Sequence, residues 1–308
     1  MWDGEWLLEY PGVAYGIGGT DPADPFRRRR PVYHREAPAI GDVGVTTDDQ
    51  PRPRTDGVAF GLDSRQGRTI RFEVGLQGSG DTDWEAEADV LRLAAELELA
   101  WRADTIRRTP GAMATLSTRN AGRERMVYGR PRRFVRMDTR RKSAGKVTAT
   151  CEFDTTDDLF YGRTQQGVVV PWLPPSSGGV VGPLVAPVTT TQAFSSPGLV
   201  YVDSDLPVHS VSILQGPITN PVVELVNEWK LELQTSIPQG VTVTLDSRPW
   251  RRTVLRSDGG SLAGRLTRTS RLDRATVNPG PHTVRLTGTD NTGLSSLTFA
   301  WQPTHASI

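Results

Sequence analysis

The sequence predicts a mainly β protein built from two domains, and three observations point to this class. Short runs that alternate apolar and polar residues recur along the chain and end at Gly, Pro or Asn turn signals. One segment, 84–102, carries the 3.6-residue periodicity of an amphipathic helix. A Pro- and Gly-rich stretch, 165–188, separates the half that contains this helix from a half that reads as strands throughout.

The first domain is expected over residues 1–164. The helix from about Trp84 to Arg102 is expected to be capped by Asp81, Thr82 or Asp83, because each of these side chains can accept a hydrogen bond from the first turn. The opening 1–57 is rich in turn formers and has long loops, which usually have a partner. Strands are expected at 5–10, 13–17, 31–35, 58–62, 69–76, 113–117, 125–128, 132–138 and 146–153.

The second domain is expected over residues 189–308, after a linker at 165–188. Within 222–234 Val223, Leu225, Trp229, Leu231 and Leu233 share one face, which predicts a half-buried antiparallel strand with Trp229 in the core. The spacing of turns without intervening helices favours a β-sandwich or jelly roll. Further strands are expected at 191–195, 198–203, 209–215, 240–246, 252–256, 261–265, 282–288 and 295–301.

Composition excludes several classes of protein. The 308 residues carry a net charge of +1, so no global field favours nucleic acid or an anionic membrane. Cys151 is the only cysteine and lies in an alternating apolar run, which excludes an internal disulfide and predicts a buried thiol. No stretch is long and apolar enough to span a bilayer, and the N-terminus does not have the pattern of a secretory signal. We therefore expect a protein that stays in the cytoplasm or leaves it without a signal of its own.

The residues that usually carry catalysis do not converge in this sequence. His34, His209, His282 and His305 lie in four separate contexts, and none has metal-ligand spacing. Carboxylate pairs for glycoside hydrolysis could be drawn from Asp203, Asp205, Asp246 or Asp258, but the sequence does not give their separation. We expect no catalytic residues, no cofactor and no metal site.

A basic face is expected on the strands between Arg119 and Lys146, where eleven Arg or Lys residues stand against two acidic residues. Strand alternation spreads these charges over a sheet surface, which favours contact with an acidic protein surface and leaves phosphate or nucleic acid as an alternative. The basic run Phe26–Arg30 favours a solvated or interface loop, with contact with DNA as the weaker alternative. The interface candidates are Arg125, Arg130, Arg132, Arg133 and Arg136.

Carbohydrate binding is the alternative function that the second domain raises. Sandwich domains stack sugars on exposed aromatic rings, and Trp229, Trp250 and Trp301 are available. Trp229 and Trp301 lie on apolar faces and are expected in the core. Trp250 follows Pro249 in a turn or at a strand edge and is the candidate sugar contact.

Four motifs follow one another in the second half: the turn Gly216–Pro221, the strand Gly240–Asp246, the turn Val277–Val284 and the final strand of SSLTFAW. In this order they resemble the C-terminal domain of siphophage distal tail proteins, the Siphovirus-type tail component family, with Val277 where the family pattern has Leu. The first half is similar to the family's belt domain through its helix between strands and through Gly129-Arg130-Pro131 before a basic strand. The resemblance implies an N-terminal split-barrel-like belt domain with one α-helix and a C-terminal galectin-like or jelly-roll β-sandwich.

The resemblance also implies a function without enzymatic chemistry. The chain would be a virion structural protein, a minor tail protein of an actinobacteriophage, assembled in the host cytoplasm. It would form a homohexameric ring that joins the tail tube protein to the baseplate hub or tail-associated protein. The tape measure protein and peripheral or receptor-binding fibres are further expected partners, no membrane is expected, and DNA would only pass through the channel. The alternative is an adhesin module that binds host cell-wall polysaccharide.

Overall fold

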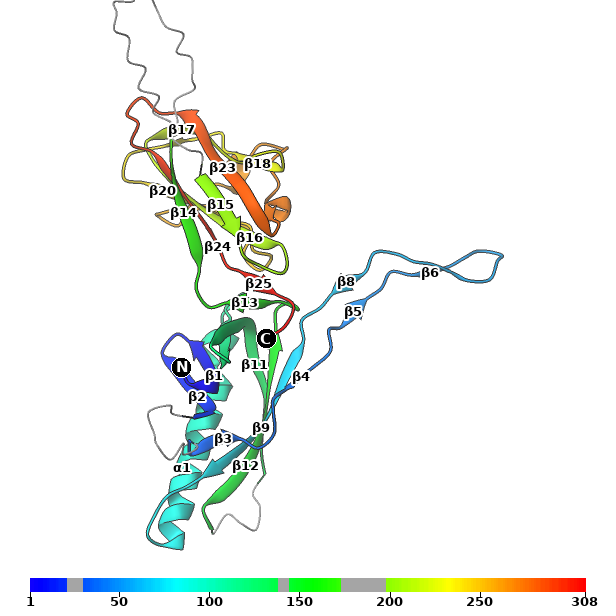
Figure 1. Ribbon diagram of the computed structural model, residues 1–308, viewed down its shortest axis with the longest axis vertical. Coiled ribbons are helices and arrows are strands. Elements are labelled where there is room, and N and C mark those ends of the chain that lie inside the picture. The colour runs from blue at the N-terminus through cyan, green and yellow to red at the C-terminus, as the bar shows by residue number, and fades with distance from the viewer. Residues whose placement is uncertain (21–29, 138–143, 173–197) are drawn as a thin grey trace, which may run out of the picture. The chain divides into compact units, whose positions relative to one another are not determined.

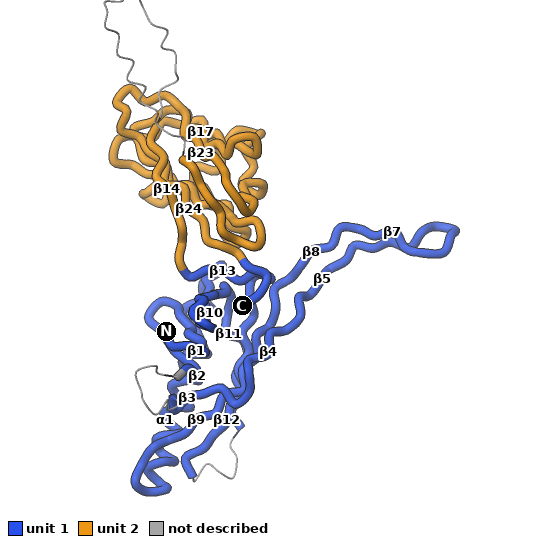
Figure 2. Tube along the Cα trace, viewed as in Figure 1, with its two compact units in different colours: residues 1–163, 305–308 blue, residues 164–304 orange. Residues whose placement is uncertain are grey.

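The computed structural model describes residues 1–20, 30–137, 144–172 and 198–308, and it divides into two compact units. The first unit holds residues 1–163 with the last four residues, 305–308, and the second holds residues 164–304 (Figure 2). Each unit has its own cluster of buried apolar side chains. The strand content of both units confirms the prediction of a mainly β protein.

One antiparallel sheet with the order β2-β1-β10-β11-β12-β9-β3 forms the frame of the first unit (Figure 1). β4 also pairs with β9, while β13 pairs with β11 and with β25. The sheet therefore brings the N-terminal hairpin beside strands from more than a hundred residues later. Its strands are β1 (Asp3–Tyr10), β2 (Val13–Thr20), β3 (Val32–His34), β4 (Ala39–Ile40), β9 (Thr69–Gln77), β10 (Ala114–Asn120), β11 (Arg123–Met137), β12 (Lys146–Thr155), β13 (Phe160–Gly162) and β25 (Thr304–His305).

Helix α1 (Asp83–Arg102) packs its apolar stripe on this sheet, and the short helix α2 (Asp104–Arg107) follows it. Trp101 is fully buried, and its ring meets that of Phe72 edge-on at 6.0 Å between centroids. Phe72 in turn meets Trp6 of β1 at 5.3 Å. The indole Nε1 of Trp101 donates to the carbonyl of Glu152 at 3.1 Å, so the ring is buried without leaving its polar atom unsatisfied.

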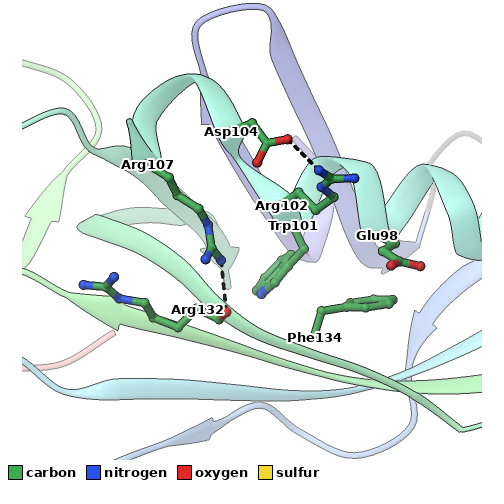
Figure 3. Close-up of a pocket in the computed structure, with 7 residues that line it drawn as sticks. All are labelled: Glu98, Trp101, Arg102, Asp104, Arg107, Arg132 and Phe134. Atoms are coloured by element: carbon green, nitrogen blue, oxygen red, sulfur yellow. Dashed lines mark hydrogen bonds and ion pairs between the residues drawn. The ribbon is translucent and has the colours of Figure 1, made fainter. Parts of the chain in front are cut away.

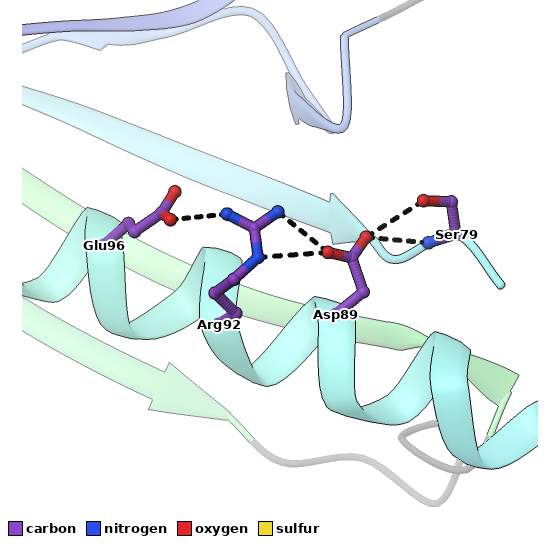
Figure 4. Close-up of polar contacts among 4 residues, drawn as sticks. All are labelled: Ser79, Asp89, Arg92 and Glu96. Atoms are coloured by element: carbon purple, nitrogen blue, oxygen red, sulfur yellow. Dashed lines mark hydrogen bonds and ion pairs between the residues drawn. The ribbon is translucent and has the colours of Figure 1, made fainter.

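Ion pairs and a cap hold the exposed side of α1. Arg92 bridges Asp89 (2.8 Å) and Glu96 (2.5 Å) at helical spacing, and Asp89 accepts from the backbone and hydroxyl of Ser79 (Figure 4). The hydrogen bond from the Ser79 backbone, followed by that from Arg92, lowers the pKa of Asp89. These contacts attach the start of the helix to the preceding turn.

The cap of α1 is a capping box between Thr82 and Glu85. The Thr82 hydroxyl accepts from the Glu85 amide at 3.4 Å, and the Glu85 carboxylate accepts from the Thr82 amide at 3.1 Å. Thr82→Ala removes the hydroxyl half of this box and is expected to destabilise the first unit by about 1 kcal/mol. Urea unfolding followed by far-UV circular dichroism measures the change. Thr82→Ser is the control, because it keeps the acceptor and should stay near wild type.

The second unit is a sandwich of two antiparallel sheets around a second core. One sheet has the order β14-β24-β16-β20-β21 with β22 beside β16, and the other has the order β15-β23-β17-β18 with β19 beside β17. The strands are β14 (Gln166–Pro171), β15 (Gly198–Val202), β16 (Val208–Gln215), β17 (Ile218–Leu225), β18 (Trp229–Glu232), β19 (Ser236–Ile237), β20 (Thr242–Asp246), β21 (Thr253–Arg256), β22 (Thr276–Val277), β23 (Gly280–Thr289) and β24 (Ser296–Trp301). The predicted sandwich is therefore confirmed, and so is the predicted place of Trp229, which packs partly buried on this core.

The strand expected at 222–234 is instead a hairpin. β17 and β18 are joined by a turn in which Asn227 has a φ of 67°. Asparagine tolerates this left-handed conformation better than most residues, which explains why a polar residue interrupts the apolar face. Asn220 and Pro221 lie within β17, at a shift of register against β23, so the turn signal that was expected to precede the strand is a bulge inside it.

Other expectations differ in detail. The two strands expected at 125–128 and 132–138 are one strand, β11, with an irregularity between Pro131 and Arg133. The strand expected at 261–265 is a 3-10 turn, η2 (Ala263–Arg265), and a second such turn is η3 (Leu272–Arg274). Part of the expected linker forms β14, which pairs with β24 along its whole length. Residues 173–188, the strand expected at 191–195, residues 26–29 and Asp138–Ser143 lie outside the described residues.

A long two-stranded arm leaves the first unit between β4 and β9. Its short ladders pair β5 (Val45–Thr46) with β8 (Ser64–Arg65) and β6 (Gln50–Pro51) with β7 (Val58–Ala59). In Figure 1 this arm projects away from the sheet that carries it. The long loops expected in the N-terminal region thus include one extended ribbon.

Candidate assembly interface

The basic strand β11 changes partners along its length. Residues 123–129 pair with β10, whereas residues from Gly129 to Met137 pair with β12. Among the described residues no strand pairs with the other edge of 132–137. This second half of β11 is therefore an edge that presents side chains and backbone to a partner.

Two of the five candidate arginines are occupied within their own unit. Arg130 is half-buried and donates from Nε to the Ala112 carbonyl at 2.6 Å and from a terminal nitrogen to the Thr109 carbonyl at 2.8 Å. Arg125 is also half-buried and donates to the Glu124 carbonyl at 3.2 Å. Arg130 fastens β11 to the segment after α2, so its position serves the fold.

The other three candidates, Arg132, Arg133 and Arg136, are exposed on the second half of β11. Arg132 pairs with Asp154 at 3.4 Å and Arg133 with Glu152 at 3.5 Å, both across the ladder to β12. These distances are long, and the arginine side chains are 54% and 63% exposed, so the pairs compensate the charge weakly. These three arginines are therefore the part of the predicted basic face that is accessible to another molecule.

A pocket of about 320 Å³ opens beside this cluster, between the end of α1 and β11 (Figure 3). Arg102 pairs with Asp104 at 3.1 Å across its rim, and Arg107 donates to the carbonyls of Pro131 and Arg132 at 2.9 and 3.0 Å. The pocket is lined by Glu98, Trp101, Arg102, Asp104, Arg107, Arg132 and Phe134.

Sequence reasoning missed Arg102, Arg107 and Glu98. They belong to the helices and not to the basic strand, and α2 was not predicted. The available signal was that Glu98 and Arg102 lie on the polar face of the predicted helix, next to its end. The pocket offers charge and an aromatic surface, which suits side chains of another protein.

The histidines and the cysteine do not converge on this pocket. His34 bonds the Ile17 carbonyl at 3.1 Å, and His282 bonds Glu228 at 2.6 Å and the Asn278 carbonyl at 2.7 Å. Burial raises the pKa of the Cys151 thiol, which disfavours the thiolate. The described part of the chain contains no group of three His, Cys, Asp or Glu residues placed to hold a metal ion. No helix in that part is both long and apolar enough to cross a bilayer.

His209 of β16 is a titratable group whose environment predicts a pH dependence. Burial, followed by the charge of Arg252, lowers its pKa from 6.5 to about 4, with Asp246 acting in the opposite direction and Arg248 adding to the lowering. The unfolded chain binds a proton at this position below pH 6.5, and the folded chain resists it until about pH 4. The stability present above pH 6.5 is therefore lost progressively as pH falls toward 4.

We expect His209→Asn to flatten the pH dependence of stability in that window. The measurement is the urea midpoint of the second unit at a series of pH values between about 7 and 4, with wild type as the comparison. The same slope in wild type and His209→Asn would show that other groups cause the acid sensitivity.

Trp250, the candidate sugar contact, lies half-buried in the turn between β20 and β21. Trp301 is buried in the second core and Trp229 donates from Nε1 to the Thr276 carbonyl at 2.7 Å. Trp250 is therefore the member of this group with a turn position, and its contact with sugar stays a prediction.

Comparison with known proteins decides the fold. No protein-family model and no curated protein sequence matches this chain. Among solved structures, the chain is similar to the SPP1 Dit protein, described as a paradigm of the hub adsorption apparatus in phages that infect Gram-positive bacteria, with a TM-score of 0.53 and 13% identity. That match covers 96% of this chain and 98% of the SPP1 protein. The chain has the fold of a phage distal tail protein.

A second structure agrees over a similar length. A chain of the phage P2 baseplate, in a structure of its activated conformation with Ca, matches with a TM-score of 0.50 and 12% identity over 99% of both chains. Both matches span the two units, so the distal tail protein fold accounts for the β-sheet frame, the helix and the sandwich together. The fold that the turn motifs imply is therefore confirmed.

Proposed function

We propose that this protein is a structural component of a siphophage tail tip, forming a homohexameric ring that joins the tail tube to the baseplate hub. The observation that carries the proposal is the likeness to a distal tail protein and to a baseplate chain over nearly the whole length of each. The exposed arginines of β11 and the pocket beside them fit such a role, since they offer a surface for protein contact.

The mechanism of such a ring is geometric and involves no chemical step. Identical subunits that meet through two different surfaces close into a ring when the rotation between neighbours divides the circle evenly. A six-fold ring would continue the channel from tube to hub, and DNA would pass through it. The second units would carry peripheral or receptor-binding proteins, and the tape measure protein would end at the ring. The protein would reside in the virion after assembly in the host cytoplasm.

The test is the mass and shape of the purified full-length chain. We expect light scattering to give a mass near six times 33.7 kDa at micromolar concentration, and negative-stain images to show rings with an open centre. A monomer at every concentration, both alone and when mixed with the tail tube protein, would overturn the proposal.

Carbohydrate binding by the second unit is the second candidate, and the turn position of Trp250 favours it. Host cell-wall polysaccharide on a glycan array should then bind wild type and not Trp250→Ala, while Trp84→Ala, which changes an exposed Trp of the first unit, should bind normally. Equal binding by wild type and Trp250→Ala would exclude this residue as the contact.

A further inference from the structure

The two-stranded arm, residues 41–68, has no core of its own. Every residue from 44 to 66 is exposed, and the ladders β5·β8 and β6·β7 contain two residue pairs each. A few local bonds support it, such as those from the Gly61 amide to Asp49 at 2.9 Å and from the Gln66 amide group to Thr46 at 2.6 Å. An isolated two-stranded ribbon is only marginally stable in water, so this arm is expected to be stabilised by packing against another surface.

Apolar side chains identify the surface that packs. Phe60 is 88% exposed and Leu62 is 90% exposed, and Val58 precedes them at the same two-residue spacing. β7 covers only Val58 and Ala59 of this segment, so the shared face of the three side chains is an expectation from their two-residue spacing in extended chain. Large apolar residues gathered on one exposed ribbon mark an interaction site.

The arm is long enough to reach another molecule. From Gly41 to the tip it runs for about a dozen residues, which at about 3.3 Å per residue spans roughly 40 Å. A compact unit of about 160 residues has a radius of gyration near 15 Å. Since the arm is exposed and its reach exceeds that radius, it is long enough to contact a neighbouring molecule.

Charge points to a second copy of this chain as that partner. The arm between 41 and 66 carries five aspartates and three arginines, whereas residues 132–137 of β11 carry three arginines and no acidic residue. The second half of β11 also exposes Val135 and Met137, at 36% and 44%, beside its open edge. The acidic arm and the basic strand are thus complementary in charge, and both offer apolar side chains.

We propose that the arm of one copy docks along the second half of β11 of the next copy, with Phe60 and Leu62 packing beside Val135 and Met137. The inference rests on the proposed ring, because two different surfaces meeting head to tail generate a closed ring or a filament. The aspartates of the arm then face Arg132, Arg133 and Arg136, and the open edge of β11 gains a neighbouring strand.

Engineered cysteines test this contact directly. Phe60→Cys and Val135→Cys together are expected to give a ladder of disulfide-linked subunits on a non-reducing gel after oxidation with copper phenanthroline in air. Either single variant should give no ladder, because the contact sets position 60 against position 135. Cys151 is buried and serves as the constant background. Phe60→Cys with Leu199→Cys is the matched control, because Leu199 lies on β15 and is 73% exposed, more than Val135.

The outcomes separate this inference from the proposed function. Rings of native mass without a ladder from the 60–135 pair would overturn the arm contact and leave the ring standing. A ladder from the 60–135 pair, together with a wild-type protein that is monomeric by light scattering, would support the contact and overturn the ring. A monomer without a ladder would overturn both.

A second pair of variants tests the apolar part of the contact without cysteine chemistry. Phe60→Asp with Leu62→Asp is expected to raise the dissociation constant of the assembly at least tenfold. Thr47→Asp with Thr55→Asp adds the same charge to the same arm at exposed polar positions and is expected to stay within a few-fold of wild type. Equal weakening by the two pairs, or no weakening by the first, would overturn the packing of Phe60 and Leu62.

Discussion

Trp101→Ala is expected to destabilise the first unit by about 3–5 kcal/mol, the cost of removing a large aromatic side chain from a packed core. The Trp101 ring is fully buried and stacks edge-on with Phe72, which links the helix to the sheet. The substitution also leaves the Glu152 carbonyl without the indole donor. Typical domains are stable by only 5–15 kcal/mol, so the substitution should remove a large fraction of the free energy of unfolding of this unit.

Trp84→Ala on the same helix is the matched control. Trp84 is 72% exposed, so the same atoms are removed without opening a cavity, and the change should stay within about 0.5 kcal/mol of wild type. Urea unfolding followed by far-UV circular dichroism, at one protein concentration for all variants, measures both. Similar midpoints for Trp101→Ala and wild type would contradict the assignment of this ring to the core.

Elements were predicted well where the residues of the element itself determine both its secondary structure and its buried face. The helix was predicted over 84–102 and spans Asp83–Arg102. This agreement arises because both the cap and the apolar stripe with 3.6-residue periodicity can be read from neighbouring residues. The interrupted strand at 222–234 was predicted less well. Its apolar residues alternate on both sides of Asn227, and periodicity does not distinguish a continuous strand from a tight hairpin that returns on the same face.

Other elements could not be predicted from local patterns, because their partners lie far away in the sequence. β14 reads as a linker because Pro171 and the following residues break the pattern, yet its strand is completed by β24, more than a hundred residues later. The arm was predicted only as a long loop, with one strand at 58–62, since Phe60 and Leu62 alternate as a buried strand would. Alternation does not say whether an apolar face meets the protein's own core or another molecule.

The sequence predicted which arginines belong to the candidate interface, but it did not predict which of them are exposed. The five arginines lie on one strand, β11, where two strands were expected with Arg130 between them; only the charge and the alternation are visible in the sequence. The half-buried position of Arg130 depends on the segment 109–112, which accepts its hydrogen bonds. That contact is tertiary, and no local pattern carries it.

The three exposed arginines should control assembly. Changing Arg132, Arg133 and Arg136 together to Glu is expected to raise the dissociation constant of the oligomer at least a hundredfold, because a basic surface that meets an acidic one then repels it. A hundredfold change corresponds to about 2.7 kcal/mol. Light scattering across a dilution series measures it. Added salt should weaken the wild-type oligomer and affect the variant less, since screening acts on the attractive pairs.

The control for the arginine variant carries the same change in net charge elsewhere. Arg265, Arg268 and Arg274 are exposed on the second unit, and their joint change to Glu should leave the mass of the oligomer unchanged. Because Glu at 132 and 133 would stand beside Asp154 and Glu152 of β12, the milder change of all three to Gln is a necessary companion. It removes attraction without adding repulsion inside the strand pair, so it should weaken assembly while circular dichroism stays as in wild type. If both variants on β11 assemble as well as the control, the basic strand does not contribute to the interface, and the contact between subunits lies on another surface.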